Sequence, residues 1–390
     1  MKRLVLAVLA TLLVLPGSVQ ADENKNLVKQ LKKGLIHHDT DDFGIALHGR
    51  IQLWGGWTDE DALLSNGDLM EEPGFRLRRA RLKVDGHFLR DYTYALELEF
   101  FDAEKLGGTL SKAWVDYSPC HYFGIHFGAD KFLLMKSDMI SSAFLPHLDR
   151  PMGTIMMSPA NTLGLVLYSE PWEDHLKISA GLFNGLRRNS SSLHDGYDGV
   201  GISLGNQFDG LAVAGRIDFE PLAPVGEGLA DTCGCKKLRL GLGVGGHMSG
   251  GDRPVIGGGN LALSAVSGYL HVKAAGFHLF GEYTRESVTP NPQPTTPDSG
   301  NEVDSQRHVA NVSLGYVFVP NTLGLAVRGE FIDPQMNVDD HLDEWAVAAT
   351  LNYYIVRDYL KAQVEYLHRQ SLNGNDPAND AVMGGVLVNF

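Results

Sequence analysis

The chain has 390 residues, 47 of them acidic and 33 basic, and a formal net charge of −14 at pH 7. This balance argues against nucleic-acid binding, which requires clustered Lys and Arg. Three cysteines, Cys120, Cys233 and Cys235, exclude a disulfide scaffold, although Cys233 and Cys235 could close a local disulfide in an oxidising compartment. The 45 glycines exceed the usual share of ~7% and suit tight turns and curved strands.

The N-terminus has the pattern of a secretory signal. Lys2 and Arg3 precede an apolar run over 4–15, which is followed by Pro16 and a small-residue site ending at Ala21. A membrane anchor is the alternative, but the run falls short of the ~20 apolar residues that a spanning helix needs. The sequence therefore predicts a signal peptide over 1–21, cleaved on export.

Residues 22–44 form the next unit, an N-terminal segment expected in the periplasm. Leu27, Leu31 and Leu35 recur at helical spacing among lysines, which predicts at most a short amphipathic helix over 24–35. Residues 37–42, HHDTDD, include metal-ligand types, but the run has no fixed geometry. A solvated linker is the preferred interpretation.

From residue 45 to the C-terminus the pattern alternates with a period of two, which is typical of β-strands. Stretch 75–100 is the clearest example, since Leu82, Val84 and Leu98 share one face while arginines and glutamates occupy the other. A sheet that is apolar on one face and ionic on the other fits a closed barrel in lipid with a wet lumen. The predicted strands number sixteen: 45–57, 75–88, 92–102, 111–118, 122–130, 161–169, 175–185, 210–220, 237–249, 262–274, 276–287, 306–319, 321–333, 343–355, 358–369 and 381–390.

The connections between these strands alternate between short and long, as in outer-membrane barrels with short periplasmic turns and longer outer loops. Segment 221–236 is the exception, because it should be a periplasmic turn and is too long. Counting 199–207 as a further strand would give seventeen. The sequence leaves the register across 186–236 open.

Two motifs and one acidic loop invite other functions. Residues 201–205 match G-x-S-x-G and residues 241–246 match G-x-G-x-x-G, but neither lies in the strand–helix context that its chemistry needs. Loop acids could hold Ca²⁺, although a solvated loop is the simpler explanation. Those residues are Asp333, Asp339, Asp340, His341, Asp343 and Glu344.

Loop 131–160 is the longest and least polar of the outer connections. Exposed on the cell surface, its Phe, Leu, Ile and Met side chains would form an apolar patch without a cause. Folded into the lumen, they could pack on the inner wall and narrow the channel. Its charged residues would then border the constriction: Lys131, Lys136, Asp138, Asp149 and Arg150. A surface or trimer-contact loop is the alternative.

The stretch FRLRRARL (75–82), the long loop that opens at Lys131 and closes on 148–151, and the terminal Phe390 resemble the phosphate-selective porin O and P family. This resemblance implies a sixteen-stranded trimeric porin of the Gram-negative outer membrane, with inward-folded loops and no enzymatic activity. It also implies an anion path, for which the candidates are Arg76, Arg78, Arg79, Arg81, Lys83, Lys131, Lys136 and Arg150. The C-terminal Phe390 would be read by the barrel-assembly machinery.

The sequence departs from the family at residues 133–135, which are Leu-Leu-Met in place of a polar turn with a proline, and at Asp149, where a glutamate is usual. The inferred lumen also mixes acids such as Glu97, Glu330 and Glu365 with its bases. Because selectivity follows the charge at the constriction, we expect passive diffusion of small solutes with at most an anion bias. A barrel lipase or protease and a secreted soluble β-protein are the alternatives, but His247, His308 and His341 have no evident catalytic partners.

Overall fold

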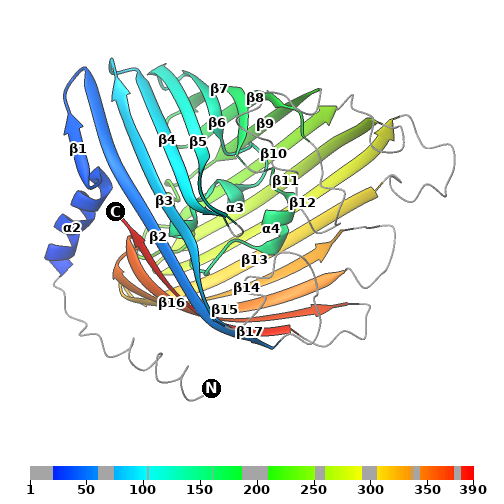
Figure 1. Cartoon of the computed structure of the whole chain (residues 1–390). Helices are drawn as coiled ribbons and strands as arrows, with labels where there is room; N and C mark the ends of the chain where they lie inside the picture. Colours follow the sequence, from blue (N-terminus) through cyan, green and yellow to red (C-terminus); the bar gives the residue numbers. More distant parts are fainter. Residues whose placement is uncertain are drawn as a thin grey trace.

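The computed structural model describes residues 21–59, 74–102, 105–159, 161–186, 210–250, 260–291, 305–334, 336, 343–372 and 379–390. Most of them belong to one antiparallel sheet (Figure 1). Its main strands are β2 (Phe43–Asp59), β3 (Gly74–Phe88), β4 (Tyr92–Asp102), β5 (Lys105–Cys120), β6 (Phe123–Asp130), β7 (Thr162–Trp172), β8 (Leu176–Asn184), β9 (Leu211–Phe219), β10 (Arg239–Gly250), β11 (Asn260–Ala274), β12 (Phe277–Asn291), β13 (Ser305–Val319), β14 (Leu323–Asp333), β15 (Glu344–Val356), β16 (Leu360–Ser371) and β17 (Asn379–Asn389).

These sixteen strands close into a barrel. Each strand pairs with its neighbour in sequence, and β17 returns to pair with β2. In the uncertain region, β9 pairs with both β8 and β10, so the ring needs no further strand there. Each predicted strand overlaps one observed strand, which confirms the all-β barrel with about sixteen strands. The largest boundary error is at β5, which begins at Lys105.

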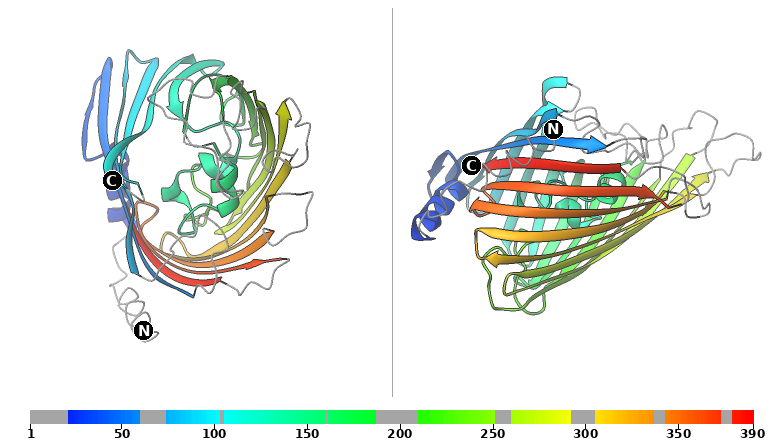
Figure 2. Two further views of the ribbon diagram at one scale, coloured as in Figure 1. Left: turned by 45° about the vertical axis from the view of Figure 1, so that its right-hand side comes forward. Right: turned by 90° about the horizontal axis from the view of Figure 1, so that it is seen from below.

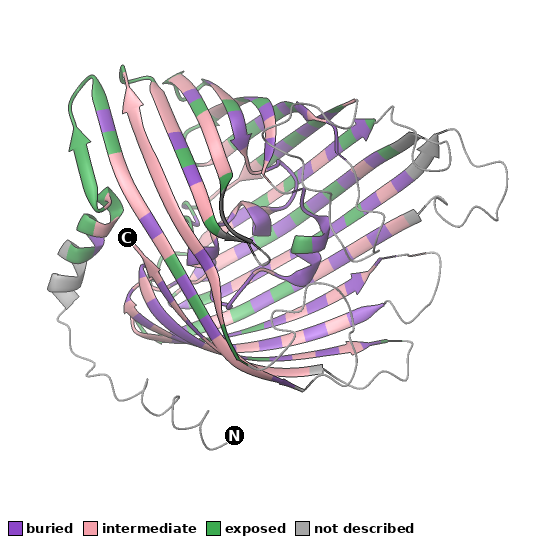
Figure 3. Cartoon of the chain, in the orientation of Figure 1, coloured by how far each residue is buried: buried purple, intermediate pink, exposed green. Residues whose placement is uncertain are grey.

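The two faces of the barrel wall differ as the alternation predicted. Along β14, Leu325 and Val327 are exposed on the outside, whereas Arg328 and Glu330 are buried inside. Figure 3 shows the same alternation of buried and exposed residues along the other strands. Apolar side chains thus point outward and most charged ones point inward.

The short connections lie at one end of the barrel, called the turn end here, together with the longer segment 220–238. The other long connections lie at the opposite end, the loop end. Five residues of the turn end have left-handed backbone at positive φ, although none is glycine: Leu89, Asp174, Ala275, Asn321 and Arg357. Such residues are uncommon outside tight turns. The turn end is therefore built of tight hairpins, as periplasmic turns are.

The prediction of a linker over 37–42 is wrong in part. Helix α2 (Ala21–Lys33) covers the predicted helix, but β1 (Ile36–Asp39) then pairs with β2. The reason lies in β2, which extends past the last strand. Phe390 pairs with Gly49, so residues 44–47 have an open edge that β1 occupies.

Loop 131–159, called L3 here, lies inside the barrel (Figure 2). It contains α3 (Lys136–Met139), the 3₁₀ turn η1 (Ser142–Phe144) and α4 (Met152–Met157). Phe132, Leu134 and Met135 are almost completely buried, in one apolar cluster with wall residues such as Ala348 and Met383. The apolar residues of L3 are thus covered by the inner wall.

The over-long connection 220–238 also reaches into the barrel. Leu229 is buried against Phe280 and Ile140, and its backbone N–H donates to the carbonyl of Phe144 in L3 at 3.2 Å. Asp231 is buried and accepts the N–H of Gly276 at 2.8 Å. Two inward segments, one from each end, therefore meet inside the barrel. In the described part, helices of membrane-spanning length and hydrophobicity do not occur.

Candidate functional site

Three buried carboxylates on the inner faces of the strands β12, β14 and β16 bind the backbone of L3. Glu282 accepts the N–H of Lys136 at 2.5 Å, Glu330 accepts that of Met152 at 2.7 Å, and Glu365 accepts that of Leu148 at 3.1 Å. Buried carboxylates and buried N–H groups both need partners. These acids therefore satisfy the loop backbone, and we call the inner face of β12–β16 the anchoring wall.

Buried cations hold the carbonyl groups of L3 in the same way. Lys361 donates to the carbonyl of Leu145 at 2.6 Å, and Arg328 donates to that of Asp149 at 2.8 Å. Arg328 is also paired with Glu330, at 2.6 Å. The mixed charges of this wall thus serve to dock the loop.

His147 sits at the centre of the docked loop. Its two ring nitrogens lie 2.8 Å from the hydroxyl of Thr350 and 2.9 Å from that of Ser313, and Glu365 lies at 3.5 Å. Burial, reinforced by the charge of Arg328, lowers the pKa of His147 to about 4. The imidazole is therefore neutral in the docked loop near pH 7.

Asp149 fastens the other edge of L3 to β3. Its carboxylate accepts Nε of Arg78 and Nη2 of Arg79, both at 2.8 Å. Burial alone would raise the pKa of Asp149, but the two guanidinium groups hold it well below its usual range. Asp149 stands where the family usually has a glutamate, and this departure retains a carboxylate that binds two arginines.

Two consecutive arginines reach the lumen because the strand has a β-bulge. The register between β2 and β3 shifts by one residue after Gln52, which lies opposite Arg79. Arg78 therefore has no residue of β2 opposite it in the register. A bulge places an extra side chain on one face. Strict alternation would have pointed one of the two arginines into lipid.

Lys131, Asp138 and Arg150 form a cluster within L3. Lys131 lies 2.7 Å and Arg150 3.4 Å from the carboxylate of Asp138, which also accepts the hydroxyl of Ser158. Although burial raises the pKa of Asp138, the two cations outweigh it and lower the pKa to about 2. Burial lowers the pKa of Lys131 to about 8 in spite of its carboxylate partner.

The remaining predicted cations are also paired. Arg81 contacts Glu99 and, at 3.3 Å, Glu97. Lys83 lies 2.9 Å from Asp85, and Lys136 lies 3.6 Å from Asp218. Arg76 is half-buried and opposite Trp54 in the register. The structure thus places all eight predicted cations in the barrel wall or L3, but most of them next to carboxylates.

A cavity of about 780 Å³ lies between L3 and the strands β2–β8, whose inner face we call the cavity wall. Its charged lining comes from both, from β9 and from segment 220–238: Arg50, Lys83, Glu97, Lys112, Asp130, Lys136, Glu170, Asp174, Lys177, Asp218, Glu220 and Glu227. Sequence reasoning missed Arg50, which donates to the hydroxyls of Ser141 and Ser142 at 2.9 and 3.0 Å. The alternation of His48, Arg50 and Gln52 with apolar residues was the signal that would have identified it.

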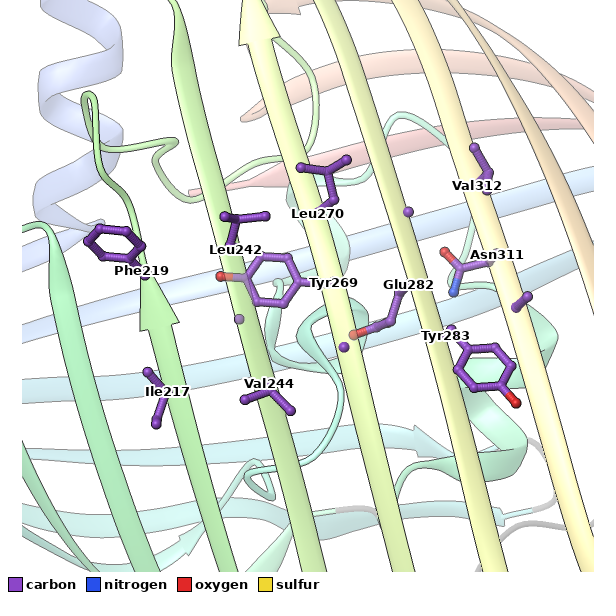
Figure 4. Close-up of a pocket in the computed structure, with 14 residues that line it drawn as sticks. Ile217, Phe219, Leu242, Val244, Tyr269, Leu270, Glu282, Tyr283, Asn311 and Val312 are labelled. Carbon is purple, nitrogen blue, oxygen red and sulfur yellow. The ribbon is translucent and has the colours of Figure 1, made fainter.

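A second hollow, of about 700 Å³, lies on the outer surface of β9–β13 (Figure 4). Leu242, Val244 and Val312 line it, and its floor includes Gly268 and Gly281. These residues belong to the outward apolar face, so the hollow faces hydrocarbon and not the lumen.

Among the residues of the G-x-S-x-G motif, the acidic loop and the cysteines taken together, the structure describes only some. The G-x-S-x-G motif at 201–205 and the loop residues Asp339, Asp340 and His341 lie outside the described residues. Asp333 pairs with His308 at 3.2 Å, and Asp343 and Glu344 are buried. Cys233 and Cys235 form a disulfide beside Asp231. Cys120 is a free, exposed thiol.

Residues 47–388 match the family model of phosphate-selective porin O and P. The chain belongs to this family. It is an outer-membrane porin, and its match covers the closed barrel from within β2 to within β17.

Solved structures of outer-membrane proteins share the porin's fold. OmpT of Vibrio cholerae is 12% identical with a TM-score of 0.58, over 91% of this chain and 100% of that one. The channel DcaP of Acinetobacter baumannii is 14% identical with a TM-score of 0.58, over 90% and 99%. OprB of Pseudomonas putida is 13% identical with a TM-score of 0.54, over 95% and 97%. No curated protein matches the porin significantly.

Proposed function

We propose that this porin is a passive channel for small hydrophilic solutes, with its conducting path along the cavity wall. One observation carries the proposal: L3 is docked on the anchoring wall, and the charged cavity of about 780 Å³ remains on the opposite side. Pore size and the charge of its lining then decide which solutes pass.

The predicted cations divide into two roles in this proposal. Arg79 and Arg150 are mostly buried, and they hold L3 through Asp149 and through backbone carbonyls at residues 138 and 140. Arg81, Lys83 and Lys136 keep a larger exposed fraction: Lys83 and Lys136 line the cavity and contact passing solutes, and Arg81 acts beside it through the lining residue Glu97. Because each of these three has a carboxylate neighbour, the channel carries at most a weak anion bias.

Planar bilayer recording tests the path. Arg81→Ala should shift the reversal potential in a salt gradient toward cations, because Glu97 and Glu99 lose their partner. Arg90→Ala, which removes an exposed arginine of a turn, is the matched control and should leave it unchanged. An unchanged reversal potential in Arg81→Ala would remove this residue from the path, and the absence of conductance steps would refute the channel.

Assembly is part of the proposal. A homotrimer is supported by the family and by a trimer form among the similar structures. Phe390 is proposed as the assembly signal, and its backbone exchanges hydrogen bonds of 2.6 and 2.9 Å with Gly49. Cross-linking in native membranes tests the trimer, and deletion of Phe390 should lower the amount of folded barrel in the outer membrane.

The N-terminal segment has a direct test as well. If residues 1–21 are a cleaved signal, sequencing of the mature protein should begin at Asp22. A mature chain that begins at Met1 would contradict cleavage.

We propose no catalytic activity. His308 pairs with Asp333 and Tyr283 on the outer face, and His247 lies under Phe132. Among the described residues neither stands beside a serine or cysteine nucleophile facing the cavity. Hydrolysis of ester or peptide substrates by the purified porin, abolished by His308→Gln, would reverse this conclusion.

A further inference from the structure

The charges of the cavity are divided by sign among the elements that line it. Strands β2–β6 and helix α3 contribute four cations and two carboxylates, namely Arg50, Lys83, Lys112, Lys136, Glu97 and Asp130. Strands β7–β9, the turn between β7 and β8, and segment 220–238 contribute one cation and five carboxylates, namely Lys177, Glu170, Asp174, Asp218, Glu220 and Glu227. One cavity thus has a basic side and an acidic side.

Most of these charges neutralise one another locally. Lys112 contacts Asp130, Lys136 contacts Asp218 at 3.6 Å, and Lys177 contacts Glu170 at 2.9 Å. Paired charges present little net field to a solute. The residual charges of the cavity are therefore those without a pairing partner.

On the basic side that residual charge is Arg50. Its guanidinium donates to the hydroxyls of Ser141 and Ser142 and to the side-chain oxygen of Asn389, at 2.9–3.2 Å. All three partners are neutral. No carboxylate of the described residues lies within ion-pair distance of Arg50, so no ion pair neutralises its charge.

On the acidic side the residual charges are Glu227, Glu220 and Asp174. Glu227 in segment 220–238 and Asp174 in the β7–β8 turn are exposed, and neither has a cation within ion-pair distance in the described part of the chain. Glu220 accepts only a backbone N–H, that of Val225 at 2.7 Å. These carboxylates can receive an ammonium group.

Unlike residual charges on two sides of one cavity favour a solute that carries both signs. A small anion gains at Arg50 and is repelled by the acidic side, and a neutral solute gains at neither side. We infer that the cavity preferentially takes small zwitterions, namely free amino acids and short peptides, with the carboxylate at Arg50 and the ammonium at the acidic side. The volume lies in the range of ~300–1,000 Å³ typical of small-molecule sites.

This inference rests on the proposed channel function, and four solutes of similar size test the two separately. Proteoliposomes of the full-length mature porin are exposed to isosmotic alanine (zwitterion), lactate (anion), lactamide (neutral) and isopropylammonium (cation), and swelling rates are compared. Alanine should enter severalfold faster than the other three. Equal rates, or lactate fastest, would overturn the zwitterion preference and leave the channel intact. Absence of swelling with every solute would refute the channel itself.

Variants locate the two sides. Arg50→Gln should reduce the alanine rate to that of lactamide, and Glu227→Gln should reduce it in part, because the other carboxylates of the acidic side remain. Arg50→Lys, which keeps the charge, should retain most of the preference. Arg90→Gln and Glu173→Gln remove exposed charges outside the cavity and are the matched controls. If the preference survives in both Arg50→Gln and Glu227→Gln, the assignment is wrong. Because Glu227 is exposed, its variant keeps the test valid even if the Arg50 variant folds poorly.

Discussion

The anchoring wall and the cavity wall carry similar charged residues but use them differently. On β12–β16, Glu282, Glu330 and Glu365 are buried and bond to the backbone of L3. On β2–β8, Lys83, Lys112 and Lys177 stay partly exposed and pair with neighbouring acids. Charge in a barrel lumen therefore has two roles, docking a loop and lining a path, and burial distinguishes them.

The largest expected effect comes from removing an anchoring acid. Glu282→Ala leaves two backbone N–H groups and the hydroxyl of Ser137 without their acceptor. We expect a loss of about 4 kcal/mol in the free energy of unfolding, together with proteolytic access to L3. Denaturant titration in detergent measures the first and limited proteolysis the second.

The matched control for that prediction is Glu170→Ala on the cavity wall. Glu170 pairs with Lys177 where both side chains are substantially exposed, and such pairs contribute about 0–1 kcal/mol. A loss of stability equal to that of Glu282→Ala would show that the two walls are energetically alike.

The next effect is a dependence on pH that His147 imposes. Its pKa is about 4 in the docked loop and ~6.5 in a released one, so the released loop binds the additional proton between these values. The contribution of His147 should lower the stability of the docked loop by roughly 3 kcal/mol as the pH falls from ~6.5 to ~4, and this contribution should be constant above pH ~6.5. Channel noise should increase over the same range.

The groups that face His147 are Glu365 and Lys361 from β16, Arg328 from β14, His278 from β12, and the hydroxyls of Thr350 and Ser313. His147→Gln retains hydrogen-bonding capacity without this titration. In this variant the stability of the docked loop should change little as the pH falls from ~6.5 to ~4. An unchanged acid response in this variant would assign the effect to other groups.

The smallest effect on stability should come from the cavity wall itself. Lys112→Gln removes a partly exposed cation that pairs with Asp130. Stability should change by less than about 1 kcal/mol, since the pair is accessible to water. The reversal potential should move toward cation selectivity, because Asp130 remains. A large stability loss with unchanged selectivity would contradict the division of roles.

Local patterns were sufficient to predict the strands, because lipid on one side and water on the other impose a period of two on each strand. They failed where pairing depends on distant segments. β1 forms only because the pairing of β17 along β2 stops at Arg50, and the arginine pair at 78–79 faces inward only through a bulge. Neither feature has a signal in its own stretch of sequence.

The sequence predicted which loop enters the barrel and which of its charged residues cluster, but not the contacts that hold the loop. Loop 131–160 was singled out by its apolar residues, and Lys131, Asp138 and Arg150 do cluster there. The acids that hold L3 are 146, 178 and 217 residues away from the N–H groups they accept, so sequence order gave no hint of the contacts. For this reason the sequence did not distinguish the charged residues that dock L3 from those that line the cavity, whereas the structure does.

Thiol accessibility in the open channel tests the separation of the two walls most directly. In a Cys120→Ser background, which removes the exposed free thiol, Lys112→Cys and Ser313→Cys place a thiol on the cavity wall and on the anchoring wall under His147. A charged thiol reagent should modify Lys112→Cys rapidly and change its conductance, while Ser313→Cys stays protected. Equal rates of modification at both positions would contradict the docking of L3 and the path derived from it.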